Sequence, residues 1–219
     1  LLTNQLTLEK FNLTNGFYSG IKNIFPGSGY IDFHNENLIL LSSRGIIAYY
    51  PYKEKPNVLF QIKNNINDFI GIKQFNKKNW FSIKDLKINK NKIYVSFTEE
   101  IKNDCWNTSL IEGEFNYDQI KFKKLFTPKN CINSNGGVDG EFNAHQSGGR
   151  ISILNDGNLL FSLGDYRSRF LAQERKTPNG KLIKLNLDSK NRYDLISMGH
   201  RNPQGLLLDE DRKIILETE

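Results

Sequence analysis

Residues 155–165 read NDGNLLFSLGD, a polar turn followed by Leu and then by alternating apolar and polar positions. Three further stretches have the same form: NENLILLSSRG at residues 35–45, NKNKIYVSFTEE at 89–100 and DEDRKIILETE at 209–219. The first apolar residues of the four stretches are Leu38, Ile93, Leu159 and Ile214, spaced 55, 66 and 55 residues apart. Alternation of this kind indicates β-strands, and its recurrence at a regular distance indicates a repeat architecture.

Each of these strands has further candidate strands around it. GYIDF, WFSIKDLKI, GGRISIL and QGLLLD precede the four stretches, and the first three stretches are each followed by two more apolar runs. Four antiparallel strands that recur in this way are typical of β-propeller blades. We therefore predict an all-β chain that forms one incomplete β-propeller domain over residues 1–219, with about three and a half blades of four strands. The expected blades are residues 27–65, 78–127 and 145–198, with a partial fourth at 203–219.

The composition excludes some classes of protein. The chain has 219 residues, is 38% hydrophobic and carries a formal net charge of +6, but its lysines are scattered and form no basic stripe. Scattered lysines do not indicate nucleic-acid binding. No apolar stretch has the ~18 residues of a membrane span. The first residue is not Met and the last residues, KIILETE, lie within a strand-like run, so we expect the chain to be a piece of a longer protein.

The two cysteines are Cys105 and Cys131. An even pair separated by loop-rich sequence is compatible with one disulfide in an oxidising compartment, and equally with two buried thiols in a reducing one. Neither cysteine belongs to a C-x-x-C motif, so a thiolate metal site is not indicated.

Two histidine-containing segments, FNAHQSGGR and SMGHRNPQG, each precede the first strand of a blade. Because the first strands of propeller blades line the central channel, both segments are expected at the same mouth of that channel. Their polar residues are Asn143, His145, Gln146 and Arg150 in the first, and His200, Arg201, Asn202 and Gln204 in the second. Such a set suits a planar, anionic ligand, because arginine offers a fixed fork of donors and neutral histidine is the usual general base near pH 7.

A structural role remains an alternative for several of these residues. His34, in the polar turn DFHNEN, is expected at the surface. His200 could simply hydrogen-bond neighbouring backbone, and Arg201 could be a structural ion-pair partner. The residues themselves leave an enzyme and a ligand-binding propeller equally open.

The segments HQSGGRISILNDGNLLFSLGD, GKLIKLNLD and MGHRNPQGLLLDEDRKIILETE carry a family resemblance. In this order and spacing they resemble the glucose/sorbosone dehydrogenase family, most strongly over residues 141–219. The resemblance implies a six-bladed propeller that binds pyrroloquinoline quinone and calcium and oxidises an aldose-type sugar. A propeller of the same fold that binds a glycan or a protein outside the cell, without catalysis, is the alternative.

The resemblance also implies roles for individual residues. His145 would be the general base that takes a proton from the sugar hydroxyl while hydride passes to the quinone. Arg201 and Asn202 would contact the cofactor, and Gln146 and Asp165 would contact the substrate. An external electron acceptor is implied as well, and a homodimer is a further expectation.

Three departures from the family pattern affect these expectations. Ala144 stands immediately before the histidine, where members of the family often have Asp or Asn. Residues 166–176, YRSRFLAQERK, replace a Gly-rich continuation and bring arginines toward the pocket. The calcium ligands are expected beyond residue 219, with no metal site within this chain, so the chain alone is expected to be truncated and inactive.

Members of this family are exported, which implies a periplasmic or secreted location. In that setting the resemblance favours a Cys105–Cys131 disulfide. Closing a loop of this length by a disulfide is typically worth ~3 kcal/mol.

Overall fold

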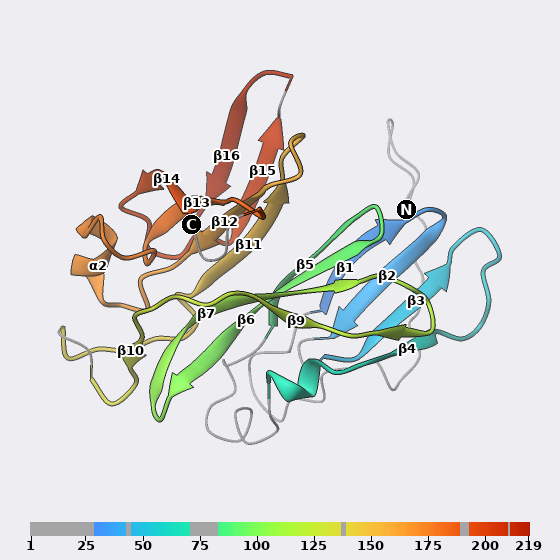
Figure 1. The fold of residues 1–219 in the computed structure, drawn as a ribbon, viewed down its shortest axis with the longest axis horizontal. Helices are drawn as coiled ribbons and strands as arrows, with labels where there is room; N and C mark the ends of the chain where they lie inside the picture. The colour runs from blue at the N-terminus through green and yellow to red at the C-terminus, as the bar shows by residue number, and fades with distance from the viewer. Residues whose placement is uncertain (1–28, 43–44, 71–82, 137–138, 189–192, 210) are drawn as a thin grey trace, which may run out of the picture.

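The computed structural model describes residues 29–42, 45–70, 83–136, 139–188, 193–209 and 211–219. Within these residues the chain consists of β-strands, one 3-10 turn and one short helix. The strands form four separate sheets that follow one another along the chain (Figure 1). The prediction of an all-β chain is confirmed.

The first sheet contains β1 (Gly29–His34), β2 (Asn37–Ser42), β3 (Ile47–Pro51) and β4 (Phe60–Asn64). These four strands pair in sequence order and are antiparallel. A short fifth strand, β8 (Gln119–Ile120), adds to β4 in parallel, although it comes from the next repeat. The 3-10 turn η1 (Ile66–Asp68) follows β4.

The second sheet contains β5 (Ile83–Asn89), β6 (Lys92–Lys102) and β7 (Cys105–Glu114). Two short strands share the outer edge of β7: β9 (Lys123–Phe126) pairs with one end and β10 (Ile132–Asn133) with the other. Of the apolar run IKFKKLF at residues 120–126, the second of the two runs that follow this repeated stretch in the sequence, only β9 joins this sheet, because Ile120 pairs with the first sheet. The predicted residues 78–82 lie outside the described residues.

The third sheet contains β11 (Gly148–Ile153), β12 (Leu159–Leu163), β13 (Lys181–Leu185) and β14 (Tyr193–Met198), paired antiparallel in that order. The helix α2 (Arg169–Gln173) lies between β12 and β13 along the chain. The last sheet is the hairpin of β15 (Gly205–Asp209) and β16 (Ile214–Thr218). Each first hairpin of a sheet includes one of the four repeated stretches from which the propeller was predicted.

The first strands of the four sheets are neighbours in space. β1 contacts β5, β5 contacts β11, and β11 contacts β15 (Figure 1). The first two of these contacts contain the same kind of hydrogen bond. The Ile88 amide of β5 donates to the Asp32 carboxylate of β1 at 2.7 Å, and the Ile151 amide of β11 donates to the Asp85 carboxylate of β5 at 2.8 Å. A carboxylate on one inner strand thus binds an amide of the next, which is how consecutive blades are held in register.

The core lies between the sheets rather than inside any one of them. One apolar cluster joins the first and second sheets through residues such as Ile62 and Phe97. Another joins the second and third sheets through residues such as Tyr94 and Phe161. A third, smaller cluster contains Trp106, Ala144 and Tyr166. The middle strands β6, β7 and β12 are buried along most of their length, whereas the edge strands β9 and β14 are more exposed.

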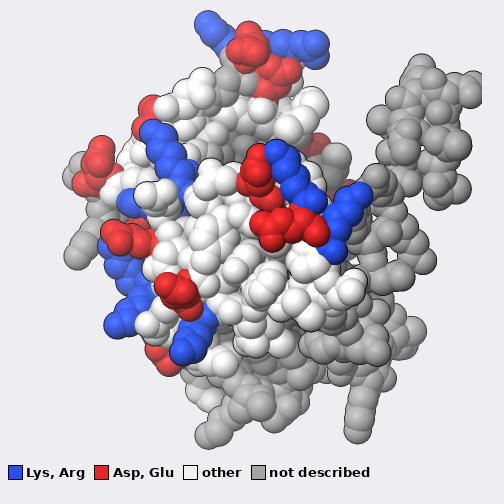
Figure 2. Space-filling model, turned by 90° about the vertical axis from the view of Figure 1, so that its right-hand side faces the viewer, with Lys and Arg blue, Asp and Glu red and all other residues white. Residues whose placement is uncertain are grey.

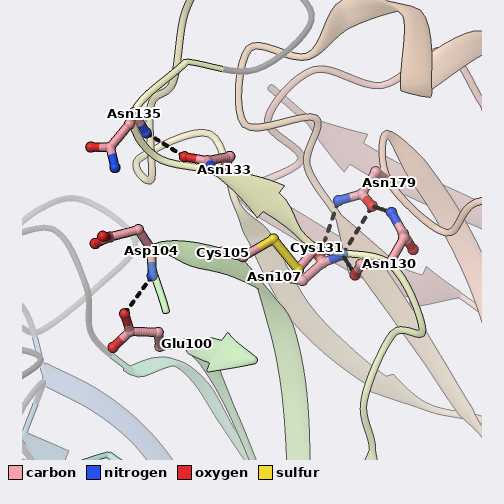
Figure 3. The surroundings of a disulfide bond; sticks show 9 residues. All are labelled: Glu100, Asp104, Cys105, Asn107, Asn130, Cys131, Asn133, Asn135 and Asn179. Carbon is pink, nitrogen blue, oxygen red and sulfur yellow. Dashed lines mark hydrogen bonds between the residues drawn. A yellow bond between two sulfur atoms is a disulfide. The ribbon is translucent and has the colours of Figure 1, made fainter. Parts of the chain in front are cut away.

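A disulfide joins Cys105, at the start of β7, to Cys131, just before β10. Figure 3 shows a group of asparagines beside it. Asn107 and Asn179 exchange hydrogen bonds of 3.0 Å, and Asn130 donates to the Asn179 side chain at 2.8 Å. Asn179 also donates to the Gly164 carbonyl at 3.1 Å, which ties the disulfide region to the end of β12.

The charged side chains are mixed rather than segregated. On the face shown in Figure 2, the described basic side chains lie beside acidic ones. Ion pairs among the described residues include Lys124–Glu99 and Lys184–Asp156. No helix in the described part of the chain has the length and apolar character needed to cross a membrane.

The expectation that His34 lies in a free surface turn is wrong. His34 ends β1 and is partly buried, with its Nδ1 2.8 Å from the Tyr117 hydroxyl and its ring 4.7 Å from that of Phe115. Both partners come from the loop between β7 and β8, which closes over the first sheet. The sequence could not show this, because the contact joins residues more than eighty positions apart.

Candidate active site at the junction of two blades

The two histidine segments lie together in the structure. Residues 143–147 lead into β11 and residues 199–204 lead into β15, and these two strands are in contact. The Arg150 guanidinium donates to the Gln204 carbonyl, and the Gln204 amide donates to the His145 carbonyl at 3.3 Å. The Gly148 amide lies 3.4 Å from the Asn202 side-chain oxygen. Both segments therefore lie at the same end of adjacent inner strands, as the sequence predicted.

His145 sits in a tight turn that Asn143 closes. The Asn143 side chain accepts the His145 amide at 2.9 Å, and its carbonyl accepts the Gln146 amide at 3.1 Å. The imidazole is half-buried. Burial, and after it the positive charge of Lys84, holds the pKa of His145 below its ordinary value of 6.5. The ring is therefore neutral at pH 7, as a general base must be.

Gln146 orients Arg201. With the amide turned so that its oxygen faces the guanidinium, Gln146 accepts from Nη2 of Arg201 at 2.9 Å and from Nε at 3.1 Å. Gln146 is 9% exposed, whereas Arg201 is exposed. A buried acceptor that binds one edge of the guanidinium holds its plane while leaving the rest of the group accessible, so Arg201 is prepared to bind an anion.

Asp165 lies on the other side of Arg201. The Asp165 amide donates to the Arg201 carbonyl at 3.0 Å, and the carboxylate accepts the Arg167 amide at 2.8 Å. Asp165 is only 2% exposed, and burial raises its pKa against the opposing effects of the Arg167 hydrogen bond and the charge of Arg201. The next residue, Tyr166, joins this segment to the histidine turn, because its amide donates to the Gln146 carbonyl at 2.9 Å.

The structure thus brings together the five residues that the sequence singled out, namely His145, Gln146, Asp165, Arg201 and Asn202. They come from three segments, which precede β11, follow β12 and precede β15. Gly164 permits the close approach of the segment after β12 to the segment before β11, since a Cβ at this position would lie 2.2 Å from the Gln146 carbonyl oxygen. The site is a junction between two blades rather than a feature of either one.

His200 has different surroundings from His145. Its Nε2 is 2.5 Å from the Ser197 hydroxyl, and its Nδ1 is 3.1 Å from Glu217 and 3.0 Å from Glu219. The hydrogen bonds of the ring are to side chains, not to neighbouring backbone as the structural alternative supposed. His200, Glu217 and Glu219 bring three atoms able to bind a metal within 4.8 Å of one another.

Two departures from the family pattern have structural counterparts. Ala144 is fully buried among Trp106, Tyr166 and their neighbours, so its methyl group belongs to the core. Two arginines of residues 166–176, Arg167 and Arg169, share the carboxylate of Glu141, at 3.1 and 3.3 Å, so their charge is only partly balanced there.

Sequence reasoning missed two charged residues beneath the site, Lys84 and Asp85, both on β5. Lys84 is 9% and Asp85 is 8% exposed, and Asp85 pairs with Arg150 at 3.3 Å. In the sequence they resemble the solvent-facing positions of an alternating strand. A register shift between Ile83 and Asp85, together with the cover provided by β11, buries both faces of this part of β5.

Comparison with known proteins agrees with the architecture. A structure of a glucose dehydrogenase superposes with a TM-score of 0.64 at 19% identity, covering 87% of this chain and 56% of that one. The soluble aldose sugar dehydrogenase of Escherichia coli, in its apo form, gives 0.62 at 16% identity, with 87% and 56% covered. The pyrroloquinoline-quinone-bound aldose sugar dehydrogenase of Streptomyces coelicolor gives 0.63 at 17% identity, with 87% and 55% covered. A search of curated proteins found no match.

The sheets, their order and these superpositions define a β-propeller, as predicted. Residues 84–219 match the model of the Glucose / Sorbosone dehydrogenase family, and the chain belongs to that family. It spans about 56% of the length of the similar structures. The matched region begins at β5 and includes all five residues of the candidate site.

Proposed function

We propose that the protein is a quinoprotein oxidoreductase that oxidises an aldose-type sugar. The observation that carries the proposal is the pairing of a neutral, half-buried His145 with an exposed Arg201 that buried Gln146 holds in place. A base and a fixed anion-binding group carried on two segments that are hydrogen-bonded to each other suit the removal of a hydroxyl proton next to an anionic cofactor. Membership of the family, and the quinone in the name of one similar structure, support the same conclusion.

The donor set at the site fits pyrroloquinoline quinone. This cofactor is planar and anionic, and when bound it supplies the acceptor for a hydride. Arg201 would hold it through the part of the guanidinium that Gln146 leaves accessible, and Asn202 through its side-chain amide. The calcium ion that the family resemblance implies would take its ligands outside residues 1–219.

His145 would accept the proton of the hydroxyl on the carbon being oxidised. Its backbone amide and carbonyl are both bound, to Asn143 and to Gln204, so the ring is carried on a fixed turn. A base on a fixed turn needs little reorganisation to reach the substrate. Because burial and Lys84 keep its pKa low, His145 is available in the proton-accepting form at neutral pH.

Gln146 and Asp165 would contact sugar hydroxyl groups beside His145. Both also bind Arg201, Gln146 through its side chain and Asp165 through its backbone amide. A substrate that bound these residues would therefore be placed against the same guanidinium that holds the cofactor. We further propose that the protein works in the periplasm or outside the cell and passes electrons to an external acceptor; the Cys105–Cys131 disulfide supports this location. A homodimer remains a prediction.

The test uses the full-length protein reconstituted with pyrroloquinoline quinone and calcium, and assayed by dye reduction with several aldoses. We expect turnover that requires the quinone and falls by about 10²–10⁴ in His145→Ala, the range that a general base supplies. Turnover that His145→Ala leaves unchanged would refute the role of this residue. Binding of a glycan without any turnover would instead support the alternative of a non-enzymatic propeller.

A further inference from the structure

A buried lysine lies beneath the histidine turn. Lys84 is the second residue of β5 and is 9% exposed. A charged ammonium is costly to bury unless it is hydrogen-bonded, so a lysine at such a position calls for an explanation in terms of what surrounds it. Its charge lowers the pKa of His145, and the position of its side chain under the turn is a separate feature.

The side chain of Lys84 touches the turn at both of its ends. At one end, Nζ donates to the Ala144 carbonyl at 3.5 Å, immediately before His145. At the other end the aliphatic part lies against Gly149, where a Cβ would come within 2.4 Å of the Lys84 Cβ and 3.1 Å of its Cγ. The lysine therefore lies under the whole segment 144–149 that presents the imidazole.

We propose that Lys84 is a positioning residue for His145, supporting the turn at Gly149 with its alkyl chain and placing a fixed positive charge beside the imidazole. The inference rests on the proposed function, in which His145 is the base. It adds a residue on a neighbouring blade, so the reactivity of His145 depends on how β5 and β11 pack together.

The charges around the turn agree with this role. A cation beside an imidazole disfavours its protonated form, and the charge of Lys84 lowers the pKa of His145 after the effect of burial. Burial, and then the charge of Arg150, lowers the pKa of Lys84 itself to about 8, so the ammonium is still charged at neutral pH. Arg150 is paired with Asp85, and from the neighbouring segment Arg201 contributes a second cation next to the carboxylates of Asp165 and Glu219.

Histidine NMR of the full-length protein without cofactor tests the proposal directly. The imidazole Cε1 would be labelled with ¹³C, and the His145 signal assigned from its loss in His145→Ala. We expect Lys84→Met to move the titration midpoint of His145 to higher pH, while Lys84→Arg keeps it near the wild-type value. His34 and His200 are internal controls whose midpoints should not move. An unchanged His145 midpoint in folded Lys84→Met would overturn the proposal.

A second measurement needs no substitution at Lys84, in case that variant does not fold. In the wild-type protein the His145 signal should show a second, smaller inflection near pH 8, where Lys84 loses its charge. The labelled Cε of Lys84 should titrate with the same midpoint. If Lys84 titrates in this range and the His145 signal does not respond, the two groups are not coupled and the proposal is wrong.

Kinetics separate this inference from the proposed function. Where turnover is seen, the acid limb of the kcat/KM profile should move to higher pH in Lys84→Met, in step with the His145 midpoint. A His145 midpoint that responds to Lys84 in a protein without turnover would support the positioning and refute the enzyme. Turnover that requires His145, together with a His145 titration midpoint that does not change in Lys84→Met, would support the enzyme and refute the positioning role of Lys84.

Discussion

The turn before β11 and the turn before β15 occupy the same place in neighbouring blades, and each carries one histidine. Their surroundings differ in charge. His145 lies near Lys84, an ammonium supplied by the preceding blade, whereas His200 lies against the carboxylates of Glu217 and Glu219. The repeat therefore places two histidines alike, but the elements packed against them give one a lowered pKa beside a cation and make the other a member of a hydrogen-bonded cluster with carboxylates.

The difference also shows how a propeller divides roles within one site. In the proposed function the first turn would supply the base and the second turn the cofactor contacts Arg201 and Asn202, while the histidine of the second turn is bound to neighbouring side chains. The four predictions below test this contrast through stability, in order of decreasing effect.

The largest effect is expected at the glycine that lies against Lys84. Gly149 has a φ of +109°, and Gly199, in the second turn, has a φ of +101°. Alanine costs about 1–2 kcal/mol in such a left-handed conformation, and forcing a methyl group into a filled space adds about 1–3 kcal/mol. Because Gly199 has only the end of Gln173 within reach, at 3.5 Å, it lacks the second cost.

We therefore expect Gly149→Ala to lower the free energy of unfolding by about 2–5 kcal/mol and Gly199→Ala by about 1–2 kcal/mol. Urea unfolding followed by tryptophan fluorescence measures both. Equal losses in the two variants would mean that Lys84 does not fill the space beneath the first turn.

The disulfide comes next, and the strand that it anchors contacts the first turn. Cys105 starts β7, whose Thr108 donates to the Ser147 carbonyl at 2.8 Å. Replacing Cys105 and Cys131 by serine should lower the free energy of unfolding by about 3–4 kcal/mol, from the entropy of the opened loop. The mass of the wild-type protein should rise by two hydrogens on reduction. A wild-type mass that reductant leaves unchanged would show that the bond does not form.

The third prediction concerns pH. Lys84 has a pKa of about 8 in the folded protein, below its ordinary value of 10.5, so between these values the unfolded chain binds more protons. Stability contributed by this group is therefore lowest below pH 8 and rises toward pH 10.5, by up to about 3 kcal/mol. Unfolding measured from pH 7 to 10.5 should show wild type gaining stability relative to Lys84→Met. A constant difference between the two proteins would contradict the lowered pKa.

The smallest effect is expected in the second turn. His200 is partly exposed and its ring hydrogen-bonds Ser197 and Glu219, so His200→Ala should lower the free energy of unfolding by about 1 kcal/mol, the usual net contribution of such hydrogen bonds. His200→Gln, which keeps one hydrogen-bonding group, is the matched variant and should lose less. A loss of several kcal/mol in His200→Ala would show that this cluster holds the blade junction together.

Much of the fold could be predicted from local pattern. The repeated strand form around Leu38, Ile93, Leu159 and Ile214 marked the hairpins that the structure contains. The same reasoning placed too much chain in the last strand of the second blade, because Ile120 pairs with the first sheet. Local sequence carries the period of a strand, but the choice between two neighbouring sheet edges depends on contacts that only the assembled blades provide.

The sequence by itself determined the strand repeat and the motifs that carry the family resemblance, since each of these depends on residue order along the chain, and the resemblance in turn pointed to the five candidate site residues. Only the tertiary structure decided that His145 and His200 differ in surroundings, that Gln146 holds Arg201, and that Lys84 is buried under the histidine turn. The physical reason is that burial and charge at each turn come from the adjacent blade, and the distance between blades in space is not encoded in their separation along the chain.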